Sequence, residues 1–410
     1  MKKIYTTIIL AICFTAGAIA QAAWLKHEDP ILTPETDMWD EGSLGMPAVL
    51  LLNGTYHMWY SGGYWNVNVF GSGLQIGHAT SADGITWQFD ANNPVIQNGE
   101  DGSFDDTHAY LPIVEYDENT FHMYYVGNDG EYKEHLGYAT SEDGSTWTKH
   151  PDKLIFEDTD GDPYTTKVNH GDVYYDGNKF HMWAGMSGGG VYNVGYANSE
   201  DGFTWVIRDS LVMDDGNSAD WFYPRTQVAT VFQMEHPDCP GKYHMWYSGG
   251  SMNALDIGYA YSDTAMNWRS YGDGSVLKRG GSGEWDASSV CFPTVMFDED
   301  KEIFKMWFGG MAKESSSIGY AETYTVNVGN FALKSNLNVY PNPAESLMML
   351  ETEIPGSKIL ELYSVSGQVV YSSILKKAHT QIDVSSFEKG IYFVLVTNGK
   401  STATRKVLIE

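Results

Sequence analysis

The chain is poor in cysteine. It has 3 cysteines in 410 residues, and Cys13 lies in the apolar N-terminal segment. Beyond that segment only Cys239 and Cys291 remain, the first in the loop sequence HPDCPG and the second in a run that resembles a buried strand. A framework of disulfide bonds therefore does not hold this chain together. The pattern leaves open whether these two cysteines pair.

Positive charge is also scarce. The sequence has 25 Lys and Arg against 53 Asp and Glu, which gives a formal net charge of −28. A nucleic-acid groove or an anionic membrane surface needs a surplus of Lys and Arg. Neither is expected as a partner, and the negative charge mainly favours solubility.

Long apolar runs are missing after the N-terminus, so no membrane span is predicted. Residues 1–20 combine two lysines, an apolar run over 8–16 and the small residues Ala18 and Ala20. This pattern is typical of a cleavable signal peptide and predicts cleavage after Ala20. Because Ile12 precedes Cys13, where a lipoprotein signal has a small residue, we expect a secreted chain without a lipid anchor.

Aromatic residues and glycine are abundant, and they recur in a repeat of roughly 60 residues. Each copy joins a segment like YHMWYSGG to one like IGYATS followed by DGxTW. The copies cover residues 56–87, 121–147, 180–205, 243–268 and, incompletely, 304–326. Such units bury their faces only against each other. The repeat therefore predicts an all-β fold, a five-bladed β-propeller over residues 21–326.

Each copy extends backwards to a first strand. These segments begin with an aromatic residue or Pro at positions 39, 104, 163, 221 and 285, and Pro47, Pro112 and Pro293 stand ninth in three of them. A blade is then this strand, the YHMWYSGG strand, the IGYATS strand and a fourth strand starting at the Trp of DGxTW. The DG pair predicts a tight turn, because Gly adopts positive φ freely.

The fifth copy has no DGxTW turn and no fourth strand. The N-terminal sequence WLKHEDPILT from Trp24 aligns with WTKHPDKLIF from Trp147. We therefore predict that the start of the mature chain pairs into the last blade and closes the ring.

The composition changes after Val326. A polar linker over 327–336 leads to a second domain over 337–410, with VYPNP, GIYFV and a final strand that carries lysine. These motifs resemble the C-terminal sorting domain of the type IX secretion system. The resemblance implies a small Ig-like β-sandwich read as an export address by that machinery, in a bacterium of the Bacteroidota type. It implies a protein that is secreted or held at the cell surface. The alternative is an ordinary accessory β-sandwich.

Residues that recur in the repeat are explained by folding. His57, His122, His181 and His244 share one strand position, so we interpret them as packing or hydrogen-bonding residues rather than metal ligands. The same argument applies to the Trp and Asp residues of the DGxTW turns.

Residues that depart from the repeat are the candidates for function. First strands of propellers line the central channel, and they begin at one mouth. Their third positions are Glu41, Asp106, Thr165, Tyr223 and Ala287, and their fifth positions are Ser43, His108, Lys167, Arg225 and Ser289. At the eighth position, His170 replaces an apolar residue. We predict Glu41 and Asp106 as a catalytic carboxyl pair, and His108, Lys167, His170 and Arg225 as substrate-binding residues. The alternative is that both carboxylates only solvate the mouth.

The whole repeat resembles the five-bladed propeller glycosidases of families 43, 32, 68 and 130. Families 43 and 32 carry essential Asp residues just before a first-strand Pro, where this chain has Met46, Leu111 and Phe292. The basic group at His108, Lys167 and Arg225 is more like family 130, which implies Asp106 as the acid. A sialidase is excluded because the repeat is one residue shorter than the Asp-box of those enzymes and the first strands hold a single arginine.

The resemblance implies a glycoside hydrolase acting on a poly- or oligosaccharide, and the alternative is a glycan-binding or surface-adhesive propeller without catalysis. No cofactor is expected. The acidic loop EDTDGDP over 157–163 alternates carboxylates as calcium loops do but lacks their final Glu. A structural calcium there stays open, and a turn between blades is the simpler interpretation.

Overall fold

The structure is a computed structural model. It describes residues 24–35, 38–64, 73–117, 119–129, 133–157, 167–188, 191–213, 222, 225–234, 239, 241–251, 254–271, 274–301, 303–312, 315–323, 337–364, 369–398 and 402–409. The regular structure in these ranges is all β-strand, and none of it is a helix that could cross a membrane. The described residues divide into two compact units, 24–323 and 337–409. The expected signal peptide, residues 158–163 of the acidic loop and the linker lie outside the described residues.

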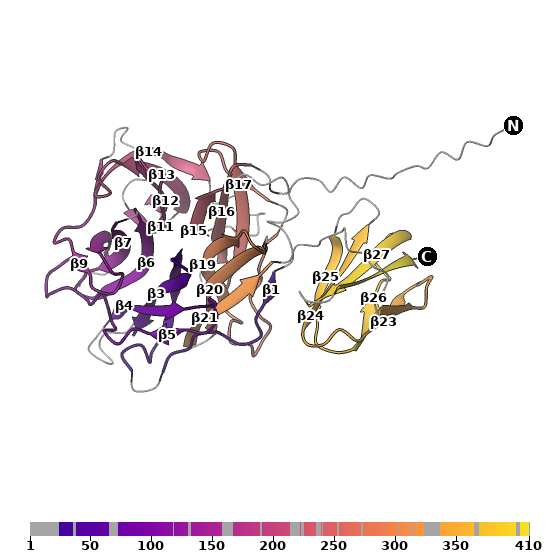
Figure 1. Ribbon diagram of the computed structural model, residues 1–410. Coiled ribbons are helices and arrows are strands. Elements are labelled where there is room, and N and C mark those ends of the chain that lie inside the picture. The colour runs from indigo at the N-terminus through magenta and orange to yellow at the C-terminus, as the bar shows by residue number, and fades with distance from the viewer. Residues whose placement is uncertain are drawn as a thin grey trace. The chain divides into compact units, whose positions relative to one another are not determined.

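The strands of the larger unit form three four-stranded sheets and one nine-stranded sheet, coloured from indigo to orange in Figure 1. By their place in the repeat we divide them into five groups, of which groups 3 and 4 make up the nine-stranded sheet. Group 1 holds β2 (Leu44–Leu52), β3 (Thr55–Gly63), β4 (Leu74–Ser81) and β5 (Gln88–Phe89). Group 2 holds β6 (His108–Tyr116), β7 (Phe121–Asn128), β8 (Glu134–Ser141) and β9 (Thr148–Lys149). Group 3 holds β11 (Lys167–Tyr175), β12 (Phe180–Gly188), β13 (Val191–Ser199) and β14 (Thr204–Met213), with the short β10 (Ile155–Glu157) parallel to β14.

Group 4 holds β15 (Arg225–Gln233), β16 (Tyr243–Ser251), β17 (Ala254–Ser262) and β18 (Arg269–Ser270). Group 5 holds β19 (Ser289–Asp298), β20 (Ile303–Ala312), β21 (Ser315–Glu322) and β1 (Leu25–Lys26). The first three strands of each group pair antiparallel in chain order, as the repeat predicts. A fourth strand beginning at Trp was expected. In groups 1, 2 and 4 it begins after the Trp and is only two residues long.

The N-terminal strand joins group 5. Leu25 pairs with Glu322 and Lys26 with Ala321, in antiparallel register. The Nζ atom of Lys26 lies 2.5 Å from Oδ2 of Asp286, a carboxylate that is fully buried at the start of the group. The predicted pairing of the N-terminal strand is confirmed.

The DG turns are stabilised by side chains of the repeat. In group 1, Gly84 has φ 79° and its N–H donates to Ser81 Oγ at 2.9 Å. The N–H of Thr86 donates to Asp83 Oδ1 at 2.7 Å. Hydrogen bonds from the backbone N–H groups of Thr86 and Ile85 lower the pKa of Asp83 to about 2. The same bonds recur around Asp143 and Asp201, which confirms that these acids serve the fold.

Three of the four turns also receive a hydrogen bond from the preceding group. Trp59 Nε1 donates to the carbonyl of Gly144 at 2.8 Å, Trp183 Nε1 to Ala265 at 2.9 Å, and Trp307 Nε1 to Gly84 at 2.6 Å. These bonds connect groups 1 to 2, 3 to 4 and 5 to 1. The tryptophan of the second strand therefore connects neighbouring groups and also packs in the core.

The smaller unit is two sheets on one core. One sheet has the order β22 (Leu337–Tyr340), β23 (Leu347–Thr352), β26 (His379–Asp383). The other has the order β25 (Val369–Leu375), β24 (Lys358–Ser364), β27 (Gly390–Thr397), β28 (Thr402–Ile409). Buried residues of both sheets, among them Leu350 and Val394, belong to a single hydrophobic cluster. This arrangement is a β-sandwich.

Candidate functional site

The first strands of all five groups surround one cavity. Its volume is about 160 Å³, and its walls come from β2, β6, β11, β15 and β19. Each of these strands contacts the next, and β19 contacts β2. The expectation that first strands line a common channel is therefore met in the described residues.

Polar groups at the tenth position of the first strands hold neighbouring groups together across this wall. Asp172 Oδ2 accepts the N–H of Val231 at 2.6 Å. Thr230 Oγ1 donates to the carbonyl of Pro293 at 2.7 Å, and Thr294 Oγ1 donates to the carbonyl of Pro47 at 2.6 Å. These three bonds connect groups 3 to 4, 4 to 5 and 5 to 1.

Two carboxyl groups face the cavity from adjacent strands. Burial raises the pKa of Glu115 to about 8, and the neighbouring charge of Asp172 adds to the shift. Burial likewise raises the pKa of Asp172 to about 7, and the N–H groups of Val231 and Val173 oppose this. The sequence reasoning missed this pair, because both lie beyond the third and fifth positions on which it concentrated.

The eighth residue of three first strands has left-handed backbone geometry. Met46, Leu111 and Phe292 have φ of 56°, 54° and 51°. A register shift in each strand accompanies this geometry. The N–H of Leu111 donates to Ser61 Oγ at 2.9 Å, and that of Phe292 donates to Ser248 Oγ at 2.8 Å.

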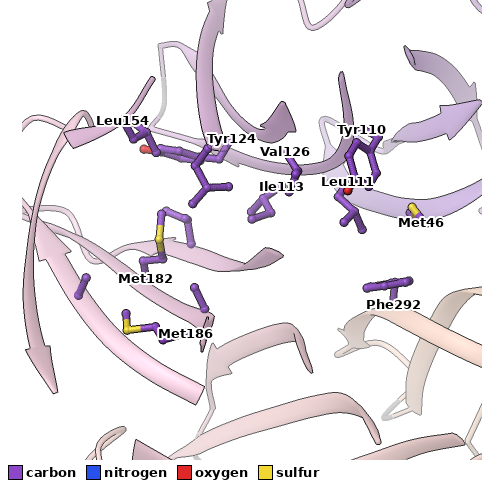
Figure 2. Close-up of a cluster of buried hydrophobic side chains, with 14 of the residues drawn as sticks. Met46, Tyr110, Leu111, Ile113, Tyr124, Val126, Leu154, Met182, Met186 and Phe292 are labelled. Carbon is purple, nitrogen blue, oxygen red and sulfur yellow. The ribbon is translucent and has the colours of Figure 1, made fainter. Parts of the chain in front are cut away.

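A bulge of this kind re-aims a side chain, and positive φ in a residue with a β-carbon is strained. Figure 2 shows Met46, Leu111 and Phe292 gathered at one side of a hydrophobic cluster. The strained position therefore presents apolar side chains from groups 1, 2 and 5.

The fifth position of the first strands connects neighbouring groups. His108 is 2% exposed, and its Nδ1 accepts the N–H of Leu74 at 2.9 Å. Ser289 Oγ accepts the N–H of Leu255 at 3.1 Å in the same way. Burial lowers the pKa of His108, which favours the neutral ring that this bond requires. One nitrogen of His108 thus serves the fold, and its role in substrate binding stays a prediction.

The two predicted carboxylates lie where the first strands of groups 1 and 2 begin. Asp106 is partly exposed, and its Oδ2 accepts the N–H of Gly102 at 2.8 Å while Oδ1 accepts the hydroxyl of Thr107 at 3.0 Å. Glu41 is exposed and accepts a hydrogen bond from the Tyr64 hydroxyl, whose pKa is raised mainly by desolvation and further by this carboxylate. Both residues are at least partly exposed to solvent.

The other predicted binding residues are placed by backbone alone. Lys167 and His170 lie in β11, and Arg225 begins β15. Arg225 pairs in register with Tyr192 of group 3. The side chains of Lys167, His170 and Arg225 lie outside the described residues.

The repeated histidines have the predicted hydrogen-bonding role. Nδ1 of His122, His181 and His244 lies 2.6 to 2.7 Å from a tyrosine hydroxyl of the third strand. In group 1 a histidine replaces this tyrosine, and His57 Nδ1 lies 3.2 Å from His78 Nε2. Comparison of IGHATS with LGYATS would have revealed His78, which the sequence reasoning missed. In the described part of the chain, no three His, Cys, Asp or Glu side chains gather as a metal site, and Cys239 and Cys291 are both free.

Two family models match the chain. Residues 47–238 match the glycosyl hydrolases family 32 N-terminal domain. Residues 338–410 match the secretion system C-terminal sorting domain. An uncharacterized protein of Mycobacterium tuberculosis is 27% identical over 227 residues, which are 53% of this chain and 72% of that protein.

Solved glycosidases share the fold. A glycosyl hydrolase from Bacteroides ovatus aligns with a TM-score of 0.59 at 17% identity, over 76% of this chain and 95% of that one. A structure from a study of family 130 mannoside phosphorylases and of hydrolases that target β-1,2 mannosidic linkages gives the same values. A family 117 glycoside hydrolase of Zobellia galactanivorans aligns with a TM-score of 0.51 at 15% identity, over 73% and 90%. The larger unit therefore has the propeller-type fold of glycosidases.

Proposed function

We propose that this chain, which joins a glycosidase-like propeller to a secretion sorting domain, is a secreted glycoside hydrolase acting on a poly- or oligosaccharide. The observation that carries the proposal is the match of residues 47–238 to a glycosyl hydrolase domain. The sorting domain indicates export through the type IX system to the cell surface or the medium.

The architecture in this proposal is a propeller of five blades, one for each strand group, closed by the N-terminal strand. The pairing of β1 with β21 and the contact of β19 with β2 support it. The smaller unit is the Ig-like sorting domain in this proposal.

The chemistry assigns one carboxyl group to each half of the reaction. Cleavage of a glycosidic bond needs an acid that protonates the leaving oxygen and a second carboxylate that activates water or attacks carbon. Asp106 is the acid in this proposal, and Glu41 is its partner. The bonds from Gly102 and Thr107 orient the Asp106 carboxylate. His108, Lys167, His170 and Arg225 bind the sugar.

The decisive experiment compares wild type with Asp106→Asn and Glu41→Gln on a polysaccharide panel of mannan, arabinan, levan and agar. Both variants keep the size of the side chain and an acceptor oxygen. We expect wild type to release sugar from one member and each variant to lose at least a hundredfold in turnover while still binding it. The control is Asp101→Asn, an exposed acid of the same loop. Full activity in both variants would remove these two residues from the mechanism.

The second candidate function is glycan binding without hydrolysis. It is favoured by Met46, Leu111 and Phe292, apolar residues on the strained positions where the resemblance to families 43 and 32 implies essential Asp. Binding to a panel member with no product after long incubation would establish this function instead.

A further inference from the structure

The second position of the first-strand segments holds a buried acid in three groups. These acids are Asp40 in group 1, Asp105 in group 2 and Asp286 in group 5, and each is at most 3% exposed. A β-carbon added to Gly62 would lie 2.6 Å from Cβ of Asp40, and one added to Gly127 would lie 2.7 Å from Cβ of Asp105. In groups 1 and 2 the acid therefore packs directly on the backbone of the second strand.

In groups 2 and 5 a lysine of the fourth strand neutralises this acid. Lys149 forms an ion pair with Asp105, and Lys26 forms one with Asp286 at 2.5 Å. Both lysines hold the same place in the sheet, opposite an alanine of the third strand. Asp105 also accepts the hydroxyl of Tyr125 at 2.9 Å. A buried carboxylate that keeps its charge needs partners of this kind.

Group 1 has the acid without the lysine. Phe89 holds the lysine position, opposite the alanine of β4. The Phe89 ring lies 5.9 Å from the Tyr60 ring, much as Lys149 Nζ lies 5.7 Å from the Tyr125 ring. Among the described residues no Lys, Arg or His forms an ion pair with Asp40. The Tyr60 hydroxyl, at 3.3 Å, is the one side-chain donor to its carboxylate in that part of the chain.

The remaining groups show that the acid and the lysine belong together. In groups 3 and 4 the acid position is Tyr164 and Phe222, and the lysine position is Ile207 and Ser270. These groups have neither charge. In the sequence, only group 1 combines the acid with a residue other than lysine. The fold is compatible with the complete pair or with its absence, so the lone acid of group 1 needs a separate explanation.

The surroundings of Asp40 favour a neutral carboxyl group. Burial raises its pKa, and the negative charge of Glu35 adds to the shift, while its own backbone N–H and the Tyr60 hydroxyl oppose it. The side chains on this side of group 1 are thus a phenol from β3, an aromatic ring from β5 and an acid from the same segment. None of them supplies a positive charge, so Asp40 keeps its proton to a higher pH than an exposed aspartate does.

Asp40 shares a tight turn with Glu41, the predicted catalytic partner. The N–H of Glu41 donates to the carbonyl of Met38 at 3.2 Å, and the N–H of Ser43 donates to the carbonyl of Asp40 at 3.2 Å. The packing of Asp40 on Gly62 fixes this turn to β3. Ionisation of Asp40 would place an uncompensated charge at that contact, one residue from Glu41.

We propose that Asp40 is a positioning residue that holds Glu41 in place only while its carboxyl group is protonated, which makes group 1 a proton switch of the sugar site. The inference rests on the proposed carbohydrate function and deepens it by giving the site a pH range. Because the folded pKa lies above the unfolded value, the stabilisation of this turn is complete below the unfolded value and is lost as pH rises through the folded one. The site is therefore ordered on the acidic side.

The test supplies the missing cation or removes the charge. Phe89→Lys installs the residue that groups 2 and 5 have, and Asp40→Asn stays neutral at every pH. Hydrogen exchange of a peptide covering residues 38–45 is followed by mass spectrometry in the full mature protein, at about pH 4.5 and at pH 8. Comparing proteins at the same pH cancels the intrinsic dependence of exchange on pH.

We expect wild type and Asp40→Asn to exchange alike at about pH 4.5. At pH 8 the peptide of wild type should be at least tenfold less protected than that of either variant. Gln88→Lys is the control, because it adds the same charge at an exposed neighbouring position whose side chain points to the other face of the strand. This control should behave like wild type at both pH values. Asp40→Asn alone decides the matter if Phe89→Lys fails to fold.

Sugar affinity is measured at the same two pH values. Titration calorimetry uses oligosaccharides of the polymer that wild type binds among mannan, arabinan, levan and agar. We expect wild type to lose at least tenfold in affinity between about pH 4.5 and pH 8, and Asp40→Asn to lose less than threefold. A merely structural role of Asp40 would not change this pH profile.

The outcomes separate the switch from the proposed function. Equal protection of wild type and Asp40→Asn at pH 8 would overturn the switch, whatever the sugar results. Altered protection with the same binding profile in both proteins would overturn the positioning role and leave the proposed function standing. Wild type that binds no member of the panel at either pH would overturn the proposed function, and the positioning role with it.

Discussion

Trp59 Nε1 donates to the carbonyl oxygen of Gly144, 2.8 Å away in the next strand group. The equivalent Trp246 in group 4 is fully buried, yet its Nε1 has no partner among the described residues. The reason lies in the sequence, because group 5 lacks the DGxTW turn whose carbonyl would accept this bond. The two tryptophans therefore have similar burial but different hydrogen bonding.

This difference predicts unequal costs for one substitution. Trp59→Phe and Trp246→Phe remove the same volume, but only the first removes a hydrogen bond; the Gly144 carbonyl then keeps Trp147 Nε1 as its remaining donor. We expect Trp59→Phe to lower the free energy of unfolding by about 1 kcal/mol more than Trp246→Phe. Urea denaturation of both variants measures the difference. Trp183→Phe should behave like Trp59→Phe, and an equal or larger loss in Trp246→Phe would contradict the explanation.

The N-terminal strand gives the second prediction. Deleting residues 21–30 removes β1 and the ion pair of Lys26 with the buried Asp286. We expect a large fall in melting temperature, since the edge of group 5 is then exposed and a buried carboxylate loses its cation. Calorimetry on the truncated chain measures it, and an unchanged melt would argue against a closed ring.

Point variants separate the ion pair from the strand. Lys26→Met should cost about 3 kcal/mol, because it leaves Asp286 buried without a cation. The double variant Lys26→Met/Asp286→Leu should recover much of this loss. Lys153→Met, at an exposed position, serves as the control.

Much of the fold could be predicted because it repeats. Several copies of one strand pattern make the assignment of each strand more certain than a single copy would. The alignment of Trp24 with Trp147 was enough to place the N-terminal strand. The site was harder to predict. Positions three and five were chosen because they depart from the repeat, but His108 departs from it and still binds the backbone of Leu74. A residue that differs from the repeat can bind a ligand, or it can make a structural contact that other groups make with a different residue. The sequence alone does not distinguish these two cases.

The contacts of each side chain in the folded structure distinguish a binding role from a structural one, and the sequence does not show these contacts. Glu115 could not be identified from the sequence because its importance comes from its neighbour Asp172 on the adjacent first strand. Thr230 could not be identified because its importance comes from its bond to the carbonyl of Pro293 in the next group. Both properties depend on which strands become neighbours after folding.

The channel carboxyls predict how stability changes as the pH rises from about 4 to 8. The pKa of Glu115 is raised to about 8 and that of Asp172 to about 7, chiefly by burial. With folded values above the unfolded ones, the native state binds more protons than the unfolded chain between about pH 4 and 8. Stability therefore falls as pH rises through this window.

Denaturation midpoints at pH 5, 7 and 9 test this. Glu115→Gln should flatten the decline between pH 5 and 9. Asp172→Asn should also flatten the decline, because an amide does not titrate. The amide oxygen can still accept the N–H of Val231, so this bond is kept. Glu142→Gln, an exposed acid, should keep the wild-type slope. Steep wild-type behaviour in both channel variants would show that these groups do not cause it.

The histidine pair of group 1 predicts the opposite dependence on the acidic side. Burial lowers the pKa of His57, to which the neighbouring His78 contributes. Burial also lowers the pKa of His78, against the opposing effect of Asp90, whose Oδ2 lies 2.9 Å from Nδ1. With folded values below the unfolded value near 6.5, the unfolded chain binds more protons in this window. Stability is complete above about pH 6.5 and is lost as pH falls through the folded values.

The repeat itself supplies the variant that tests this. His78→Tyr installs the residue found at this position in the other four groups, where in groups 2 to 4 its hydroxyl lies 2.6 to 2.7 Å from the strand-two histidine. The substitution removes one titrating ring and the charge repulsion between the rings of His57 and His78. We expect the loss of stability between pH 7.5 and 5.5, measured by urea denaturation, to shrink relative to wild type, while His150→Gln, outside this pair, leaves it unchanged. A His78→Tyr protein that is as acid-sensitive as wild type would place the acid-labile group elsewhere in the molecule.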